Sequence, residues 1–286
     1  MATLGIDIGG TSTKLALLQG DQPPHTLRTD TYREPSNNQL ADAIRDTIAQ
    51  LPKASIDRVG VCVPGPLSND GTLEAAANLP HLINQNIPRW IQTATPKATH
   101  IIACTDAVAA AIADHRKHPT SGRSLYLSIG TGVGGAVLDA GIPLIIARGT
   151  PGHLGHIDVS GGQPDAPITP GAGRGALEAY IGARGLRDDG VPLDTPEQLN
   201  AAQTHPRVLD GIDALARGLR IFLAIFRPNE IVFMGGVAPL IEHHLDRILN
   251  QTRTDLTPAA PKNFTIRFTQ VGRFAAAIGA ATHANQ

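Results

Sequence analysis

The feature that most restricts the possible folds of this chain is a pattern of strand, glycine-rich turn and strand that occurs near the start of each half. The turns are Gly9-Gly10 and residues 130–135, and short apolar runs flank them at 4–8, 14–18, 124–129 and 136–139. A repeat on this scale indicates two related lobes and not a short-period repeat protein. The length of 286 residues agrees with two lobes, because domains commonly contain about 100–200 residues.

The rest of the chain alternates between strand-like and helix-like segments. Strands are expected at 25–33, 58–63, 100–105, 142–147 and 230–234, helices at 40–51, from Asp106 to about 115 and at 209–223, and a loop at 163–173. Ser36 and Asn37 are candidate caps for the first helix, and Pro228 ends the last one. This order predicts an α/β fold with mixed sheets flanked by helices.

Composition and charge exclude several classes of function. The formal net charge is −1 and the isoelectric point is near 6.8, so the sequence has no basic field of the kind that holds nucleic acid. It has no apolar run of about 18 residues, as a membrane span requires, and residues 1–10 do not resemble a signal peptide. Cys62 and Cys104 lie in apolar runs and are expected to be thiols of the core. We therefore expect a cytoplasmic protein without nucleic-acid or membrane partners.

Both glycine turns have the residue types that phosphate binding requires. Phosphate oxygens need backbone N–H groups at close range, and glycine allows the backbone this approach. Thr11 and Thr131 add hydroxyl donors, and Asp7 at the end of the first strand is placed to hold Mg²⁺ through water. For either turn alone, a tight hairpin without a ligand is the simpler interpretation. The two turns together with Asp7 favour phosphate binding.

Two common nucleotide-binding motifs do not fit the second turn. Gly130, Gly132 and Gly135 match Gly-x-Gly-x-x-Gly, but a strand and a turn follow them instead of the helix that a dinucleotide fold requires. The sequence also lacks the Gly-x-x-x-x-Gly-Lys-Ser/Thr motif of a P-loop. The turns therefore belong to another class of phosphate-binding protein.

With these turns and several further motifs, the chain resembles the ROK family of bacterial sugar kinases. The motifs stand in the family's order: Asp-x-Gly-Gly-Thr at 7–11, the sugar-binding segment at 63–66 and 77–79, the catalytic segment at 105–107, the second phosphate loop at 130–135, the Gly-Glu-x-Gly-His signature at 152–156, the end of the zinc motif at 175–178 and the adenosine motif at 233–237. The resemblance covers nearly the whole chain. It implies the two-lobed actin-like ATPase (ribonuclease H-like) fold, with residues 1–107 and 270–286 in one lobe and 108–269 in the other.

The resemblance also implies roles for the matched residues. Asp106 is then the catalytic base, whereas without its flanking motifs it would be interpreted as a helix cap. ATP is assigned to Asp7, Gly9, Gly10, Thr11, Lys14, Gly130, Thr131, Gly132, Gly134, Gly235 and Gly236, and Mg²⁺ to Asp7. The sugar is assigned to Pro64, Gly65, Asn78, Thr105, Asp106, His153, His156 and Glu178.

Four of these residues have a structural alternative. Lys14 is equally suited to the edge of a strand, and Asn78 to a turn before a proline. His156 is equally suited to a structural role, and Glu178 to a first-turn charge that the helix dipole favours.

The chain departs from the family where the zinc and the sugar are bound. His153 replaces the signature glutamate, and Thr105 replaces an asparagine. The three zinc cysteines fall at Thr169, Gly171 and Ala176, which supply no thiolate. Structural zinc needs four protein ligands, so we expect no zinc. A different metal pair formed by His153 and His156 with Asp158 is the alternative.

By resemblance, the expected activity is transfer of the γ-phosphoryl group of ATP, with Mg²⁺, to a hexose or N-acetylhexosamine at its 6-hydroxyl, with glucose as the default acceptor. ATP and the sugar are expected to meet in a cleft between the lobes, and a homodimer is a further expectation. The alternatives are a kinase for another sugar or a cyclitol, a polyphosphate-dependent kinase, and a catalytically lapsed nucleotide-binding protein. A sugar-responsive repressor is disfavoured, because the first phosphate loop begins at Asp7 and leaves no room for a DNA-binding domain before it.

Overall fold

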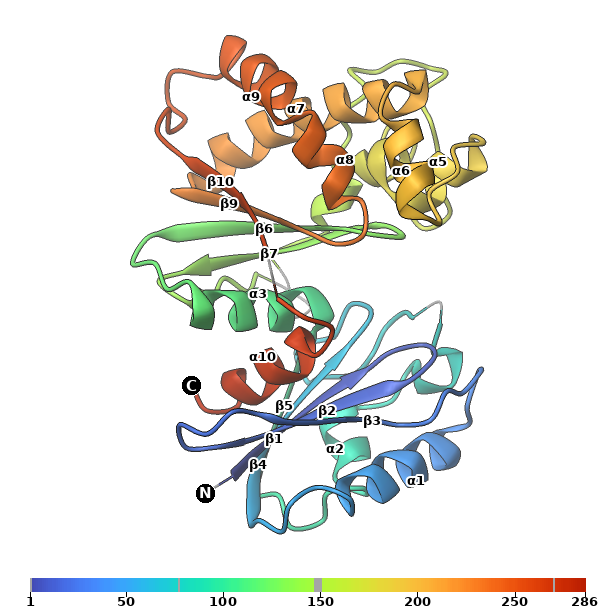
Figure 1. Cartoon of the computed structure of the whole chain (residues 1–286), viewed down its shortest axis with the longest axis vertical. Helices are drawn as coiled ribbons and strands as arrows, with labels where there is room; N and C mark the ends of the chain where they lie inside the picture. The colour runs from blue at the N-terminus through green and yellow to red at the C-terminus, as the bar shows by residue number, and fades with distance from the viewer. Residues whose placement is uncertain (1, 77, 147–150, 270) are drawn as a thin grey trace. The chain divides into compact units, whose positions relative to one another are not determined.

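The computed structural model describes residues 2–76, 78–146, 151–269 and 271–286. They form two five-stranded mixed sheets flanked by helices, in the orders β3-β2-β1-β4-β5 and β10-β9-β6-β7-β8, which confirms the predicted fold class (Figure 1). The chain divides into two compact units: the first holds 1–119, 141–152 and 270–286, and the second holds 120–140 and 153–269. Ala77, Ala147 and position 270, which appear in the sequence predictions, lie outside the described residues.

The first unit is built on a sheet whose central strands are buried on both faces. Every residue of β1 is buried, and β1 runs antiparallel to β2 and parallel to β4, which in turn runs parallel to β5. Its elements are β1 (Ala2–Ile8), β2 (Thr13–Gln19), β3 (His25–Arg28), α1 (Asn37–Ile48), β4 (Ile56–Val63), η1 (Pro80–Leu82), α2 (Ile87–Ile91), β5 (His100–Thr105), α3 (Asp106–Lys117) and α10 (Ala275–His283).

The first helix spans Asn37–Ile48 instead of the predicted 40–51, and its N-cap is Ser36, one of the two predicted candidates. The Ser36 hydroxyl accepts a hydrogen bond from the Gln39 N–H, and the Gln39 side chain accepts one from the Ser36 N–H, so the two residues form a capping box. The strand predicted at 25–33 is shorter than expected, since β3 ends at Arg28. Residues 29–32 leave the sheet because their polar groups bond to the first glycine turn instead.

Helix α10 lies against β1, β4 and α3 at very short range (Figure 1). The approach depends on three glycines, because a Cβ on Gly5, Gly60 or Gly279 would lie 1.7–1.8 Å from a backbone oxygen of α10 or α3. The sequence analysis did not predict this helix. Its high alanine and glycine content weakens the amphipathic pattern by which a surface helix is recognised.

The second unit carries the other sheet and most of the remaining helices. Its long helix α7 ends at Phe226, and its C-cap Arg227 adopts a left-handed conformation (φ 51°) just before Pro228. The strand predicted at 142–147 is only the two-residue β8. The remaining elements are β6 (Arg123–Ile129), β7 (Val133–Asp139), η2 (Leu154–His156), α4 (Leu177–Ile181), α5 (Ala183–Asp188), α6 (Pro196–Ala202), α7 (Pro206–Phe226), β9 (Glu230–Met234), α8 (Ala238–His243), α9 (Leu245–Thr254) and β10 (Thr265–Phe268). Strand β8 (Ile142–Pro143) completes the order of this sheet but belongs to the 141–152 segment of the first unit.

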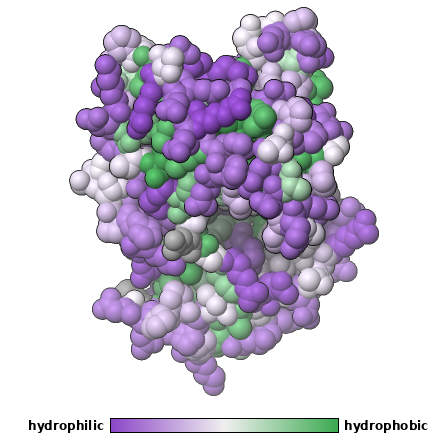
Figure 2. Space-filling model, turned by 45° about the horizontal axis from the view of Figure 1, so that its top comes forward, coloured by the Kyte–Doolittle hydropathy of each residue, from purple (hydrophilic) through white to green (hydrophobic). Residues whose placement is uncertain are grey.

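The burial of the cysteines and the character of the surface agree with the expectations drawn from the sequence. Cys62 and Cys104 are buried free thiols, as predicted. Among the described residues, no helix is both long enough and apolar enough to cross a membrane. The face drawn in Figure 2 is covered mainly by hydrophilic residues, and hydrophobic ones appear in small groups.

Substitution of Gly279 by alanine tests the close packing of α10. Alanine favours a helix by about 1 kcal/mol over glycine, but its methyl group would lie 1.7 Å from the carbonyl oxygen of Ala109. Overpacking commonly costs about 1–3 kcal/mol, so we expect Gly279→Ala to lower the free energy of unfolding in urea. Gly272→Ala is the control, since nothing lies within 4 Å of that position. Equal stability of the two variants would contradict the packing account.

Candidate functional site

Three neighbouring parallel strands of the first unit end at one edge of its sheet. Asp7 lies opposite Cys62 of β4, and Val63 lies opposite Thr105 of β5. The carboxyl ends of parallel strands meet at the same edge, where ligands of open α/β sheets bind. This register therefore brings together three elements that the sequence predicted separately: Asp7, the segment that begins at Pro64, and Asp106.

The first glycine turn is held by the segment that follows β3. The Tyr32 hydroxyl donates to the Gly9 carbonyl at 2.7 Å. The Tyr32 N–H donates to the Thr11 carbonyl at 2.9 Å, and the Thr29 N–H donates to the Thr13 carbonyl at 2.9 Å. A second segment therefore occupies the carbonyl oxygens on one side of the turn.

The N–H groups of the same turn are left available. Within the described part of the chain, the N–H groups of Gly10, Thr11 and Ser12 donate to no protein acceptor. Gly10 also touches the sugar-binding segment, because a Cβ on it would lie 2.5 Å from the Cβ of Asn78. Consecutive unpaired N–H groups in a glycine turn form an anion-binding concavity.

Asp7 has both carboxylate oxygens engaged. Lys14 donates to Oδ2 at 2.8 Å, and the Cys62 thiol lies 3.7 Å from Oδ1. Lys14, predicted as a phosphate ligand, therefore has its ammonium directed at Asp7. The side chain of Asp7 is buried, so this donor set fits a hydrated Mg²⁺ held through water better than direct coordination.

Asp106 is the first residue of α3, and Thr105 is its N-cap. The Thr105 hydroxyl accepts from the Val108 N–H at 3.4 Å, so the capping role considered for Asp106 belongs to Thr105. Oδ1 of Asp106 accepts from the Ala107 N–H at 2.7 Å, and in the described residues no other residue donates to Oδ2. The residue is exposed. Desolvation of its carboxylate by the surrounding protein, with a smaller contribution from the charge of Asp7, nevertheless raises the pKa of Asp106 to about 6.

The second glycine turn repeats the arrangement of the first. The carbonyls of Gly130 and Thr131 accept from the N–H groups of Ala183 and Arg184, at 2.8 and 3.0 Å. These donors belong to the first turn of α5. Among the described residues, the N–H groups of Thr131 and Gly132 donate to no protein acceptor. The same combination of bound carbonyls and available N–H groups thus occurs in each unit.

Three predicted sugar ligands lie close to this second turn. Glu178 accepts from the Val133 N–H through Oε2 at 2.9 Å. The turn of η2 is equally near, since a Cβ on Gly155 would lie 2.2 Å from the Val133 carbonyl oxygen. His153 and His156 flank Gly155 with stacked rings, whose centroids are 5.0 Å apart. Both histidines are exposed.

The predicted adenosine motif also borders the second turn. Gly235 has φ 100°, and a Cβ there would lie 2.3 Å from the Ile129 carbonyl oxygen, so only glycine fits. The Val237 N–H donates to the same oxygen at 3.0 Å. A Cβ on Gly236 would meet nothing within 4 Å, so this side of the motif is open. Gly134 lies in β7 opposite Ser128.

The segment that aligns with the family's zinc motif is closed by backbone hydrogen bonds. The Gly175 N–H donates to the Pro167 carbonyl at 2.9 Å, and Arg174 donates to the Ala166 carbonyl at 2.8 Å. Ala176 is buried, and the buried Thr169 hydroxyl has no hydrogen-bond partner among the residues that the structure describes.

No alternative metal site is evident in the same region. Within the described ranges, no group of three or more His, Cys, Asp or Glu side chains is placed to hold a metal ion. Asp158, considered as a partner for the histidine pair, accepts from the Ser160 N–H and hydroxyl at 2.8 and 2.7 Å. The absence of zinc stays a prediction.

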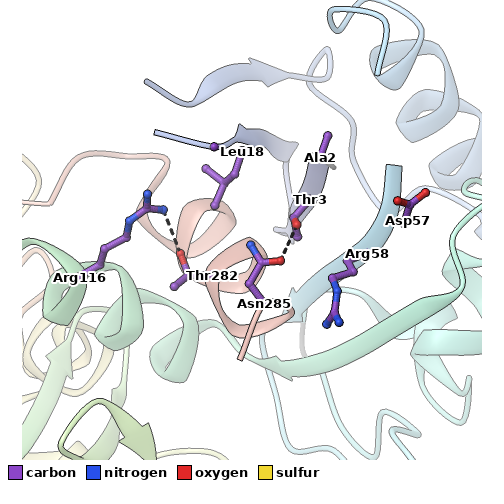
Figure 3. Close-up of a pocket in the computed structure, with 9 residues that line it drawn as sticks. Ala2, Thr3, Leu18, Asp57, Arg58, Arg116, Thr282 and Asn285 are labelled. Carbon is purple, nitrogen blue, oxygen red and sulfur yellow. Dashed lines mark hydrogen bonds between the residues drawn. The ribbon is translucent and has the colours of Figure 1, made fainter. Parts of the chain in front are cut away.

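A separate pocket of about 350 Å³ lies between β1 and the end of α10 (Figure 3). Its two arginines contact the end of that helix: Arg58 donates to the Ala284 carbonyl at 2.8 Å, and Arg116 lies 3.5 Å from the Thr282 hydroxyl. Cations are favoured at helix C-termini, which explains both arginines without a ligand. None of the predicted site residues lines this pocket.

Sequence analysis did not identify Tyr32 or Thr29 as residues of the site. Tyr32 is one of only three tyrosines in the chain and follows a strand in a polar segment. This was the one available signal, because an isolated aromatic residue in a polar loop needs a structural partner.

The chain is similar to sugar kinases over nearly its whole length. A model of the ROK family matches residues 3–286. The N-acetylmannosamine kinase of Salmonella typhi is 30% identical over 266 residues, which are 87% of this chain and 87% of that protein.

Solved structures agree. The ROK hexokinase from Thermus thermophilus has a TM-score of 0.80 and 27% identity, with 100% of this chain and 98% of that chain covered. The ROK family glucokinase from Streptomyces griseus, solved with glucose and AMPPNP, has a TM-score of 0.74 and 23% identity, with 100% of both chains covered. These likenesses confirm the fold expected from the sequence.

Substitution of Thr169 by valine tests the segment that lacks the zinc thiolates. A buried hydroxyl without a partner costs about 1–3 kcal/mol, so we expect Thr169→Val to raise the free energy of unfolding by about 1 kcal/mol. Thr47→Val is the matched control, because the buried Thr47 hydroxyl donates to the Ala43 carbonyl at 2.8 Å and its loss is destabilising. Urea unfolding of both variants compares them. A loss of stability in Thr169→Val as large as in the control would show that this hydroxyl has a partner.

Proposed function

The chain belongs to the ROK family, and from that premise we propose that it phosphorylates a hexose or an N-acetylhexosamine at the 6-hydroxyl, with ATP and Mg²⁺. Its named relatives are sugar kinases, and the chain is a sugar kinase. One observation carries the finer proposal. Each unit has a glycine turn with available N–H groups, and the first unit adds an aspartate with a free carboxylate oxygen and a raised pKa.

Asp106 is the proposed general base. Its Oδ1 is fixed by the Ala107 N–H, and its Oδ2 is free to accept the proton of the sugar hydroxyl. The hydroxyl oxygen then forms a bond to the γ-phosphorus, the bond from that phosphorus to the β-γ bridging oxygen breaks, and ADP leaves. A carboxyl with a pKa of about 6 is mostly ionised at neutral pH and is still basic enough to take the proton.

The two turns are the proposed phosphate ligands. Catalysis of phosphoryl transfer consists mainly of positioning and charge stabilisation, and preorganised N–H groups supply both. Gly10, Thr11, Thr131 and Gly132 provide these groups. Mg²⁺, held through water near Asp7, would neutralise charge on the β- and γ-phosphate oxygens. Lys14 orients the Asp7 carboxylate for this role through their ion pair of 2.8 Å.

In each unit, a proposed sugar ligand lies against the glycine turn. Asn78 lies against the first turn, and Glu178 lies against the second. Glu178 uses Oε2 for the Val133 N–H, so Oε1 is left to accept from a sugar hydroxyl. The names of the Salmonella and Streptomyces relatives support N-acetylmannosamine and glucose as the first acceptors to test. Absence of zinc, a homodimer and a cytoplasmic location remain part of this proposal.

Asparagine at position 106 tests the proposed base. Asp106→Asn should lower kcat by about 100- to 10,000-fold, the usual contribution of a general base. In the unchanged protein, kcat/KM for the sugar should fall as the pH drops through about 6, because protonation of Asp106 removes the base. Coupled ADP release over pH 5–9 measures both effects.

The stability of the same variant separates loss of the base from loss of the fold. Burial raises the folded pKa of Asp106 above its unfolded value, so its effect on stability becomes unfavourable as the pH rises through about 6. Asp106→Asn should therefore unfold at pH 8 at a temperature no lower than the parent protein. Near-normal turnover by a folded Asp106→Asn protein would refute the assignment.

His153 is the residue proposed to set the choice of sugar. A neutral imidazole has one donor and one acceptor, whereas the family glutamate offers several acceptor sites and a charge. Loss of one charged hydrogen bond weakens a ligand by roughly 10- to 100-fold. We therefore expect poor activity on glucose and a preference for a sugar or cyclitol that offers an acceptor at that position. His153→Glu should raise kcat/KM for glucose relative to the native substrate.

The test of His153 needs four values of kcat/KM and one control variant. We would measure kcat/KM for glucose and N-acetylmannosamine with the parent protein and with His153→Glu. His243→Glu introduces the same charge at another exposed histidine, on α8, and should leave the ratio unchanged. Efficient glucose phosphorylation by the parent, impaired by His153→Glu, would show that the site has been reshaped around histidine.

A further inference from the structure

We infer that Tyr32 is a positioning residue that aims the N–H groups of the first glycine turn at the phosphates of the donor. The inference rests on the proposed function for the identity of the ligand. The positioning itself rests on hydrogen bonds within the first unit. Tyr32 belongs to none of the family motifs that the sequence matches.

Tyr32 contacts the turn at three points. Its hydroxyl donates to the Gly9 carbonyl at 2.7 Å and lies 2.9 Å from the Thr13 hydroxyl. A phenol has one proton, so the Thr13 hydroxyl is the donor in the second contact. The Tyr32 N–H donates to the Thr11 carbonyl at 2.9 Å. One residue outside the turn thus binds two of its carbonyls.

Because the peptide group is planar, these contacts also fix the direction of the backbone N–H groups that follow the bound carbonyls. A carbonyl and the N–H of the next residue belong to one rigid plane and point in opposite directions. Fixing the Gly9 carbonyl therefore fixes the Gly10 N–H, and fixing the Thr11 carbonyl fixes the Ser12 N–H. Both of these N–H groups are without a protein acceptor in the part of the chain that the structure describes. Tyr32 consequently aims two phosphate-binding donors away from itself.

The ring of Tyr32 is held by packing inside the protein, and its hydroxyl stays protonated. Its ring packs against the hydrophobic core of the first unit. Burial raises the pKa of Tyr32 to about 12, so the hydroxyl remains a donor throughout the working pH range. A pocket of about 520 Å³ lies beside residues 28–33 and α1, so packing alone does not fix this segment. Its hydrogen bonds to the turn therefore matter for its position.

Tyr32→Phe removes the hydroxyl and keeps the ring in the core. Tyr180→Phe is the matched control, because it deletes the same atom in the second unit. Hydrogen exchange of the ligand-free protein should show the Gly9 and Thr13 amides exchanging about 3- to 10-fold faster in Tyr32→Phe, the effect of one lost neutral hydrogen bond. By calorimetry, the Kd for AMPPNP should rise by a similar factor, about 3- to 10-fold, whereas the Kd for AMP should not change. KM for ATP should rise while KM for the sugar stays constant.

The outcomes separate the inference from the proposed function. The inference would be overturned if hydrogen exchange at residues 8–13 and the affinity for AMPPNP changed no more in Tyr32→Phe than in Tyr180→Phe. Equal weakening of AMP and AMPPNP would also overturn it, because AMP lacks the β- and γ-phosphates at which we infer that Tyr32 aims the turn. If the parent protein binds no AMPPNP and phosphorylates no sugar, the proposed function fails. The exchange measurement still decides in that case whether Tyr32 positions the turn.

Discussion

The interaction on which the candidate site depends is the hydrogen bond that holds a carbonyl oxygen on one side of each glycine turn. Because the peptide group is planar, a held carbonyl fixes the N–H of the following residue in the opposite direction. Residues 29–32 supply the donors for the first turn, and the N-terminus of α5 supplies them for the second. A flexible glycine turn thereby becomes a preorganised set of donors, which is what phosphoryl transfer requires of a protein.

The rest of the first unit keeps this turn beside its chemical partners. Parallel pairing of β1, β4 and β5 brings Asp7 and Asp106 to the same edge of the sheet. Helix α10, from the far end of the sequence, packs on the same sheet through backbone contacts that only Gly5 and Gly60 permit. The position of the edge that carries Asp7 and Asp106 therefore depends on packing between segments more than 200 residues apart in the sequence.

In the second unit, the segment without zinc thiolates is closed by other interactions. Backbone hydrogen bonds from Gly175 and the guanidinium of Arg174 hold its ends together. The buried Thr169 hydroxyl, at a position that the family resemblance assigns to a zinc cysteine, has no hydrogen-bond partner among the residues that the structure describes. The turn that holds His153 and His156 and the side chain of Glu178 both contact Val133.

The sequence alone determined the family, the fold class and the motif residues, because glycine turns and strand ends are local patterns that a short stretch encodes. The strand predicted at 25–33 is too long, because the partners of a segment's backbone hydrogen bonds cannot be read from its own residues. Helix α10 was missed, because an alanine-rich helix leaves little periodic signal. Only the tertiary structure decided that Thr105 caps α3, that Tyr32 holds the first turn and that Glu178 supports the second. The bonds to the two turns join residues 23 and 45 positions apart. Local sequence cannot specify such pairs, because folding of the intervening chain determines which donor reaches which acceptor.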